Sequence, residues 1–526
     1  MRNKKLQVWL PLLFSIVMIA GMYYGYKLGD GKGFFKRDKQ TSLQEALNII
    51  KTQYVDPVNA DSLQAGAIQE MMSELDPHSV YFPPVELKEA IQELAGKFEG
   101  IGIEYNIFDD TLNVVYVIPD GPSDKAGLLI GDKIIAVDNI TLTSKNLSID
   151  EIREKVRGAI GSVAILQILR NGETKNLKVT RGSIPVSPVD AAYMIDKTTG
   201  YIKLNKFTAT SYEDFMKSLE SLQKQGLQKL IFDLRGNGGG YMDEAIDIAD
   251  EFLDADKLIV YTQGLNSKKK EYRCRRPGLF EKGELVILAD ELSASASEVV
   301  AGAMQDWDRA TIIGRRTFGK GLVQQQYELS DGSALRLTIA RYYTPVGRSI
   351  QRPYDKGKKI YMDEILDRYS NGEALYADSN KIVHGKEYKT VGGRIVYGEG
   401  GIMPDIFVPI DTFAFPASIN RLFINGTVNS FVYQWYLKNK TLIDKYPSAT
   451  EFAEHFSQAE EMWNDFVAYA SKNSVSLQNI SSAQKNILQN RVQANLARFR
   501  WRNYGYFQVI NHNDLVVNAA LKKLKP

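Results

Sequence analysis

The sequence predicts an α/β core that is preceded by a small β-domain and flanked by helical segments. Short apolar runs typical of buried strands occur at residues 229–234 and 285–289, and each is followed by a glycine- or serine-rich turn and a helical pattern. Residues 98–183 instead contain short strand patterns with glycine and proline turns. Apolar residues recur at helical spacing towards both ends of the chain. This order of strands and helices favours an α/β fold for the central part.

The composition is that of a globular protein with several domains. The chain has 526 residues, of which 44% are hydrophobic and 24% charged, and this length allows roughly three or four domains. The formal net charge of +2 gives no indication of nucleic-acid binding, and we expect no nucleic-acid partner. The one cysteine, Cys274, excludes an internal disulfide.

The first residues have the pattern of a membrane anchor. Basic residues precede an apolar stretch over residues 8–22, and such positive flanks stay on the cytoplasmic side. The stretch extends to Tyr26, which is just long enough to span a bilayer, and no clear cleavage site follows it. We therefore expect residues 1–27 to form an uncleaved anchor, with a cleaved signal peptide as the alternative, and the remaining chain to lie outside the cytoplasm.

The segment that follows the anchor, residues 28–97, is expected to be helical. Apolar residues recur at helical spacing from residue 43 to residue 50 and again from residue 87 to residue 94. Asp76-Pro77 lies between the two patterns and marks a break. The segment is therefore expected to contain more than one helix.

The β-domain at residues 98–183 resembles a PDZ domain. Gly100-Ile101-Gly102-Ile103 is followed by an A-G-L-x-x-G-D-x-I segment that begins at residue 126, and the two together carry the resemblance. The resemblance implies that backbone N–H groups of this glycine-bearing loop bind the terminal carboxylate of a peptide, which adds to the domain as a strand. A generic small β-domain is the alternative.

A serine and a lysine are the candidate reacting groups. Ser295 lies where the second apolar strand gives way to a helix, so its hydroxyl is exposed near the positive end of the helix dipole, which favours charge on a nearby oxyanion. Lys320 follows the next strand. The chain has 4 histidines and none lies between Asp233 and Gln326, so we expect a lysine base rather than a Ser-His-Asp triad. The ordinary alternatives are an N-cap serine and a solvated turn lysine.

A lysine base must be neutral to accept a proton. An unperturbed amine is mostly charged at pH 7, so the site must lower the pKa of Lys320 by roughly 2–3 units, which burial can do. Phe318, Leu322 and Val323 are candidates for the apolar wall. Gln324 could accept a hydrogen bond and aim the amine if the chain bends, which Gly321 permits.

A glycine-rich loop follows the first apolar strand. Four of the five residues from 236 to 240 are glycines, which is more than a plain strand-to-helix turn requires and indicates close approach of the backbone to a ligand. An N–H group of Gly239 or Gly240 could form one arm of an oxyanion hole, with the N–H of Ala296 as the other arm.

The rival interpretation of the lysine is a phosphate-binding loop. Residues 314–320 match G-x-x-x-x-G-K, but Gly321 stands where Ser or Thr would hold magnesium, and the following residues have an extended rather than a helical pattern. The sequence also contains no cluster of metal ligands near the candidate site. We therefore expect neither a nucleotide nor a metal cofactor.

Three separated motifs resemble the C-terminal processing peptidases, also called tail-specific proteases. They are D-L-R-x-N-x-G-G at residues 233–240, S-A-S-A-S-E at residues 293–298 and T-F-G-K-G-x-x-Q at residues 317–324. Further matching segments extend the resemblance over roughly residues 40–410. It implies a ClpP/crotonase-like core at residues 184–412.

The same resemblance implies a role for each candidate site residue. Ser295 would be the nucleophile, Lys320 the general base and Gln324 the residue that positions the lysine. Ala296, with Gly239 or Gly240, would supply the oxyanion donors.

The expected function is a serine endopeptidase that cleaves exported proteins near their C-termini. Its substrates would be polypeptides with free apolar C-termini, on the periplasmic side of an inner membrane. Residues 413–526 are expected to form a helical C-terminal domain with an aromatic core. An inactive PDZ scaffold or regulatory binding protein is the alternative function, and homo-oligomer formation and the choice between processing and degradation stay open.

Overall fold

The computed structural model describes residues 4–28, 41–108, 110–142, 147–254, 256–376, 385–410 and 417–525. The chain divides into two units, residues 1–74 and residues 75–526. The described residues of the first unit form three helices: α1 (Lys4–Leu28), α2 (Ser42–Gln53) and α3 (Ala60–Ser73). Among the described helices, α1 alone is long and apolar enough to cross a membrane, over Trp9–Lys27.

The predicted β-domain opens the second unit. Two short strands that pair with each other, β2 (Lys97–Gly100) and β9 (Gly182–Pro185), lie at its ends. Between them is a sheet in the order β3-β4-β5-β7-β8, with β6 paired to β5. Its elements are β3 (Ile103–Phe108), β4 (Thr111–Val117), α5 (Pro122–Lys125), β5 (Lys133–Val137), β6 (Ile140–Thr141), α6 (Ile149–Val156), β7 (Val163–Arg170) and β8 (Glu173–Thr180). In the described part of the chain β3 pairs with β4 alone, so its other edge can accept an added strand.

The α/β core is built on a six-stranded sheet in the order β10-β11-β12-β15-β16-β21. All neighbours from β11 to β21 are parallel, and β10 is antiparallel to β11. The strands are β10 (Val189–Met194), β11 (Thr199–Leu204), β12 (Lys229–Asp233), β15 (Glu284–Ala289), β16 (Thr311–Gly314) and β21 (Ile406–Phe407). The near-continuous apolar runs of β12 and β15 fit strands that are buried on both faces.

Helices cover both faces of this sheet. One face packs against α7 (Ser211–Lys224), α8 (Met242–Asp250) and α9 (Ala296–Asp306). The other face packs against α16 (Leu515–Leu524), through Val516, Val517, Ala520 and Leu524. The last helix of the chain therefore completes the core that the sequence analysis placed at residues 184–412.

A second sheet lies beside the first and carries the other half of the site. Its order is β1-β18-β13-β14, and β17 also pairs with β18. The strands are β1 (Val80–Phe82), β13 (Leu258–Gln263), β14 (Lys270–Arg273), β17 (Leu322–Glu328) and β18 (Ala334–Tyr343). The remaining elements of this region are α4 (Pro84–Leu94), α10 (Lys358–Ser370), β19 (Glu387–Lys389) and β20 (Ile395–Tyr397).

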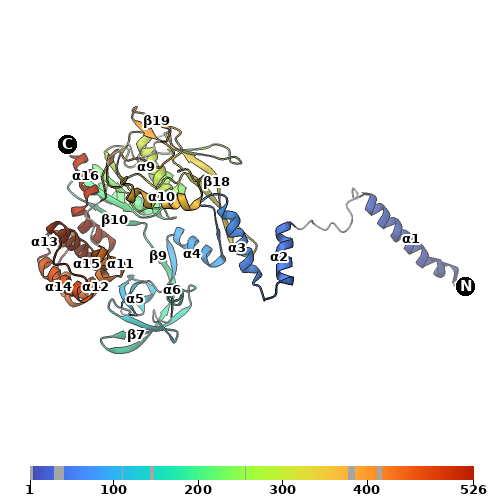
Figure 1. Ribbon diagram of the computed structural model, residues 1–526, viewed down its shortest axis with the longest axis horizontal. Coiled ribbons are helices and arrows are strands. Elements are labelled where there is room, and N and C mark those ends of the chain that lie inside the picture. The colour runs from blue at the N-terminus through green and yellow to red at the C-terminus, as the bar shows by residue number, and fades with distance from the viewer. Residues whose placement is uncertain are drawn as a thin grey trace. The chain divides into compact units, whose positions relative to one another are not determined.

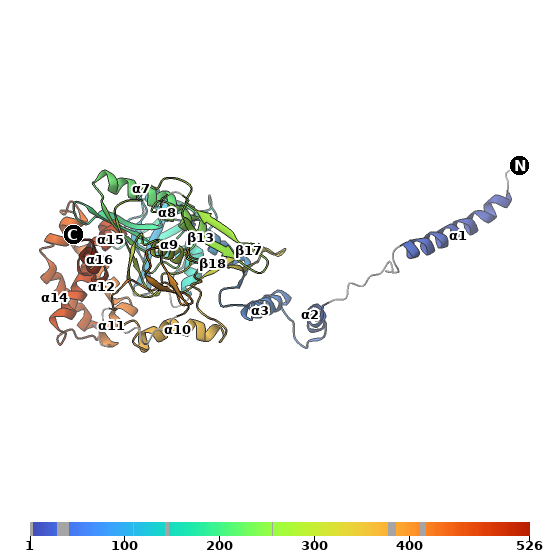
Figure 2. The ribbon, with the colours of Figure 1, turned by 90° about the horizontal axis from the view of Figure 1, so that it is seen from above.

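The C-terminal helices gather at one side of the second unit, as Figures 1 and 2 show. They are α11 (Ala417–Ile424), α12 (Thr427–Ile443), α13 (Ala449–His455), α14 (Ala459–Lys472) and α15 (Ser482–Ile510), followed by the 3-10 turn Asn511–Asn513. Their aromatic and aliphatic side chains form a separate buried cluster, as the sequence predicts for a helical domain. The long helix α15 is broken at Arg502, which has φ 58° and ψ −154°.

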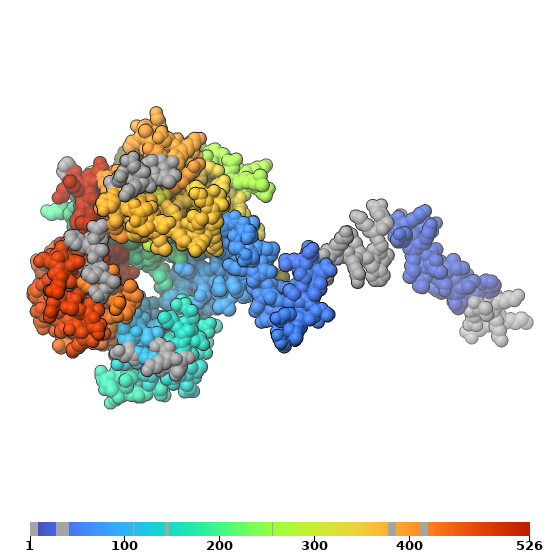
Figure 3. Space-filling view, viewed as in Figure 1, coloured from blue at the N-terminus to red at the C-terminus, as the bar shows by residue number. Residues whose placement is uncertain are grey.

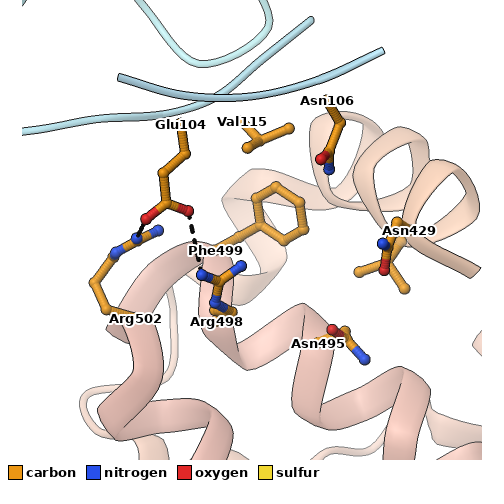
Figure 4. Close-up of a pocket in the computed structure, with 9 residues that line it drawn as sticks. Glu104, Asn106, Val115, Asn429, Asn495, Arg498, Phe499 and Arg502 are labelled. Atoms are coloured by element: carbon orange, nitrogen blue, oxygen red, sulfur yellow. Dashed lines mark hydrogen bonds and ion pairs between the residues drawn. The ribbon is translucent and has the colours of Figure 1, made fainter. Parts of the chain in front are cut away.

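These helices contact the β-domain, which lies next to them in Figure 3. Arg498 and Arg502 of α15 both point to Glu104 of β3, and the Arg498–Glu104 ion pair measures 3.3 Å (Figure 4). A polar cavity of about 150 Å³ lies between the two domains beside these residues. The aromatic rings of Tyr433 and Phe108 add an apolar contact, with 5.5 Å between their centroids.

Candidate active site

Ser295 occupies a strained turn between β15 and α9. Its φ of 56° and ψ of −113° lie outside the regions that side chains other than glycine usually adopt. The residue is held from both sides, because its N–H donates to Glu298 Oε2 at 2.8 Å and its carbonyl accepts from Tyr342 OH at 3.1 Å. Strain of this kind persists only where the surroundings enforce it, and it is concentrated at functional sites. Ser295 is also the N-cap of α9, as the sequence analysis anticipated.

Glu298 joins the serine turn to the lysine loop. Its side chain is fully buried and accepts hydrogen bonds from Thr317 Oγ1 at 2.5 Å, Gly319 N at 2.7 Å and Lys320 N at 2.8 Å, besides Ser295 N. Burial raises the pKa of Glu298. The sequence analysis assigned no role to this residue, although a Ser followed three residues later by Glu is the signature of a capping box.

Lys320 has the properties that a general base requires. Its Nζ donates to Gln324 Oε1 at 2.9 Å, the contact that was expected on condition that the chain bends between them. Burial, followed by repulsion from the charge of Arg336, lowers the pKa of Lys320 to about 8. The negative charges of Asp76 and Glu298 act in the opposite direction.

Two features of the chain lie between Lys320 and Gln324. The pairing of β17 with β18 shifts register between Val323 and Gln324. At Gly321, a Cβ would lie 3.0 Å from the backbone nitrogen of Gln351. The glycine permits close contact with the neighbouring segment.

A turn far upstream in the sequence holds Gln324. The amide of Gln324 donates to the backbone carbonyl of His78. This turn is closed by Asp76, which accepts from the N–H groups of His78 and Ser79, each at 2.9 Å, and from the Ser79 hydroxyl. Asp76 to Ser79 is one of the segments in which the chain resembles the C-terminal processing peptidases, although no role was predicted for His78. Burial lowers the pKa of His78 to about 3, so its ring is neutral. Its Nε2 lies 2.9 Å from Tyr361 OH and is hydrogen-bonded to it.

The glycine loop lies against the serine turn, as predicted. A Cβ on Gly239 would be 2.8 Å from Ser295 Cβ, and Gly239 has a φ of +96°, so glycine is required there by both space and conformation. The buried Asn237 locks the two loops together, since its carbonyl accepts from Ala294 N at 3.0 Å and from Ser297 Oγ at 2.8 Å.

The backbone N–H groups predicted as oxyanion donors differ in whether they already donate a hydrogen bond. The N–H of Gly239 donates to Asn237 Oδ1 at 2.9 Å. Within the described chain, the N–H groups of Gly240 and Ala296 donate to no other residue. Ala296 is the first residue of α9, where an N–H has no partner inside the helix.

The candidate reacting and oxyanion groups line one cleft of about 780 Å³. Ser295, Lys320 and Gln324 form one part of its wall, and the glycine loop with Ala296 forms another. The lining also contains polar and charged residues, residues of α4, and the side chains of Met242, Val299, Leu322, Val323 and Tyr342. The cleft is large enough for several residues of an extended polypeptide.

The predicted peptide-binding loop lies in the β-domain. Gly102 has a φ of +76°, and the side chains of Ile101 and Ile103 are buried in the core of that domain. Ile103 begins β3, the strand with a free edge, and Gly100 ends β2. These side chains therefore shape the loop from inside, and all four residues of the loop, 100 to 103, are buried.

Profiles of known families match four parts of the chain. Peptidase family S41 matches residues 198–357, a PDZ domain matches residues 114–170, and the activating protease CtpB N-terminal domain matches residues 21–84. A family of unknown function matches residues 418–502, in the C-terminal helices. The prediction of an α/β core with a PDZ domain is confirmed.

Several curated proteins are similar over most of their length. A carboxy-terminal-processing protease of Bartonella bacilliformis is 36% identical over 308 residues, which cover 57% of this chain and 70% of the relative. A carboxyl-terminal-processing protease of a Picosynechococcus species is 32% identical, covering 71% of this chain and 93% of the relative. The carboxy-terminal processing protease CtpB of Bacillus subtilis is 34% identical, covering 60% and 67%. The chain therefore belongs to the carboxyl-terminal-processing proteases and is a serine-type peptidase with a PDZ domain.

Proposed function

We propose that this protein cleaves polypeptides near their C-termini with Ser295 as nucleophile and Lys320 as general base. The observation that carries the proposal is the state of Lys320. Its pKa of about 8 leaves about a tenth of the amine neutral at pH 7 and about half at pH 8, and Gln324 holds the amine in the cleft that also contains Ser295.

The proposed reaction has two stages. In the first, neutral Lys320 takes the proton of Ser295 Oγ while Oγ attacks the carbonyl carbon of the scissile bond. The protonated amine then gives that proton to the leaving nitrogen, and an acyl-serine remains. In the second stage, Lys320 removes a proton from water, the resulting hydroxide attacks the acyl group, and Ser295 Oγ is released and reprotonated.

The negative oxygen of each tetrahedral intermediate needs donors that are already in place. We assign this role to the N–H groups of Ala296 and Gly240, because neither donates elsewhere in the described chain and both line the cleft. Gly239 contributes by its small size, since its N–H already binds Asn237. The positive end of α9 adds to the stabilisation.

Labelling with a fluorophosphonate probe tests this assignment. The wild-type protein should be labelled, Ser295→Ala should not react, and Lys320→Ala should react far more slowly. Ser221→Ala is the control, because Ser221 is exposed on α7 and does not line the cleft. Labelling that survives in Ser295→Ala would place the nucleophile elsewhere, and absence of labelling and cleavage in the wild type would favour an inactive PDZ scaffold.

The PDZ domain is proposed to select substrates by their C-terminus. The backbone of the loop at Gly100, Ile101, Gly102 and Ile103 would bind the terminal carboxylate, and the peptide would pair with the free edge of β3. Binding there raises the effective concentration of the tail near Ser295. Two otherwise identical long peptides that end in Leu-Ala-Ala, one free and one amidated, test this step. Equal cleavage rates below saturation would contradict selection by the terminus.

The substrates are proposed to be exported proteins. The support for this is helix α1, which can serve as a membrane anchor or as a signal sequence. Either outcome would place the peptidase outside the cytoplasm. Cell fractionation with an antibody against the C-terminal domain distinguishes an anchor from a cleaved signal sequence. A protein that keeps α1 as an anchor sediments with membranes, whereas a protein from which α1 has been cleaved does not.

A further inference from the structure

The catalytic cleft is lined by more basic than acidic side chains. Four charged residues line the cleft in the described chain: Glu93, Lys206, Lys320 and Arg336. Glu93 forms an ion pair with Lys206, and Lys320 is bound by Gln324. Arg336 is the cation that is left over.

Arg336 is held in place without an acidic partner. It lies on β18, between Val80 of β1 and Gln326 of β17, and its guanidinium stacks on the ring of Phe82 with 4.6 Å to the centroid. No carboxylate of the described residues lies within ion-pair distance of it. The side chain is half-buried, and this burial lowers its pKa, while Tyr241 and Glu93 act in the opposite direction.

A half-buried guanidinium of this kind is suited to an anionic ligand. Arginine presents several N–H donors in one plane and binds carboxylates through two parallel hydrogen bonds. A cation that has already lost part of its hydration loses less on binding than a fully solvated one. Stacking on Phe82 restricts the rotamers of Arg336, and its guanidinium donates no side-chain hydrogen bond within the described chain.

We propose that Arg336 is a carboxylate-binding subsite of the catalytic cleft and makes cleavage selective for substrates with a carboxylate close to the scissile bond. This inference rests on the proposed function, because it concerns the substrate of the same cleft. The carboxylate has two sources, an acidic side chain or a C-terminus that lies in the cleft itself. The second source would be separate from a terminus bound at the PDZ domain.

Matched short peptides distinguish these sources. The first pair has both termini blocked and carries Asp or Asn at one position, which is moved through the positions around the scissile bond. The second pair has a neutral sequence and a free or an amidated C-terminus. For each pair, the ratio of kcat/KM between the charged and the neutral peptide is measured with the full-length protein.

We expect a ratio of about tenfold for the pair that places its carboxylate at Arg336, as for one hydrogen-bonded ion pair. The ratio should fall to near one in Arg336→Gln and be partly retained in Arg336→Lys. Arg341→Gln on the same strand is the matched control, because Arg341 is exposed and does not line the cleft. A selectivity for the free terminus that survives in Arg336→Gln would come from the PDZ domain.

A ratio near one for every pair in the wild-type protein would overturn the proposal without any variant. So would a ratio that is the same in wild type and Arg336→Gln. The use of ratios removes the effect of Arg336 on the Lys320 amine, which acts equally on both members of a pair. Failure of the proposed function can be told apart from failure of this proposal. If Ser295 is not the nucleophile, Ser295→Ala will still cleave the neutral peptides, whatever the ratio between charged and neutral peptides.

Discussion

The catalytic cleft and the contact between the PDZ domain and the C-terminal helices both bring charged side chains together from distant parts of the chain. The two regions bury these charged side chains to different degrees. Glu298 is 0% exposed and every hydrogen bond it accepts comes from the serine turn or the lysine loop. At the domain contact, the side chains of Glu104 and Arg498 are 37% and 41% exposed.

This difference in burial indicates a fixed geometry at the catalytic cleft and an adjustable one at the domain contact. A buried carboxylate that binds several donors cannot move without leaving them unpaired, and this holds Ser295 and Lys320 in position. Half-exposed ion pairs contribute little, because water and salt replace them at low cost. We infer that the cleft is rigid, whereas the contact between the PDZ domain and the C-terminal helices can adjust.

The largest expected effect is at the reacting pair. Ser295→Ala should lower kcat roughly 10⁴-fold or more, since it removes the nucleophile. Lys320→Arg should be as inactive as Lys320→Ala, because a guanidinium cannot give up its proton at usable pH. Initial rates on a blocked peptide measure this. Substantial activity in Lys320→Arg would show that the base is another group.

The next effect tests the rigidity of the cleft. Glu298→Ala should lower the free energy of unfolding by about 3 kcal/mol, because it leaves buried donors of both loops without an acceptor. Activity should be lost as well, since the loops are no longer joined. Urea unfolding and peptide cleavage are the measurements. Glu281→Ala, a carboxylate on a partly exposed loop of the same core, is the control. An active and stable Glu298→Ala would contradict the idea of a rigid cleft.

The pH dependence tests the charge state of the base. The lowered pKa of Lys320 means that the amine becomes neutral as pH rises through about 8, so kcat/KM should rise through that value and then level off. Arg336→Gln removes a positive charge that disfavours the protonated amine, so its midpoint should lie at higher pH.

The other charged groups that face Lys320 act in the opposite direction or do not titrate in this range. Asp76 and Glu298 raise its pKa, and His78, with a pKa of about 3, stays neutral. A rate that falls as pH rises from 6 to 9 would be inconsistent with a lysine base.

The smallest effect is expected at the domain contact. Arg498→Gln should cost about 0.5–1 kcal/mol of stability, and the loss should shrink further in high salt, as for other exposed ion pairs. Cleavage of a short blocked peptide should be unchanged, because Arg498 lies outside the cleft. Thermal unfolding at two salt concentrations measures the first effect. A loss of several kcal/mol would show that this contact is as rigid as the cleft.

Short-range patterns in the sequence were sufficient for much of the site. Ser295, Lys320 and the glycine loop each follow a strand of the core, and strand ends at one edge of a sheet converge in space. That convergence is why separate motifs could be predicted to form one site. The hydrogen bond between Lys320 and Gln324 was likewise predicted, whereas no residue type indicates the register shift that lies between them.

Contacts made by the backbone, or by residues remote in sequence, could be seen only in the tertiary structure. The carbonyl of His78 holds Gln324 from a turn more than two hundred residues upstream, and a carbonyl carries no signal in the residue type. The unpaired charge of Arg336 could not be predicted either, because it depends on the ion pair that Glu93 forms with Lys206 in the same cleft. The packing of α16 on the central sheet could not be predicted either, because an apolar helix face does not specify its partner.

Periodicity and local motifs were therefore enough to predict the fold class, the PDZ domain and the candidate reacting groups, because they encode secondary structure and the chemistry placed at its ends. The tertiary structure alone decided how Lys320 is buried and aimed, which N–H groups are free, and where the C-terminal helices dock. Those properties depend on the distances between side chains far apart in the chain, which are set by packing rather than by any single segment.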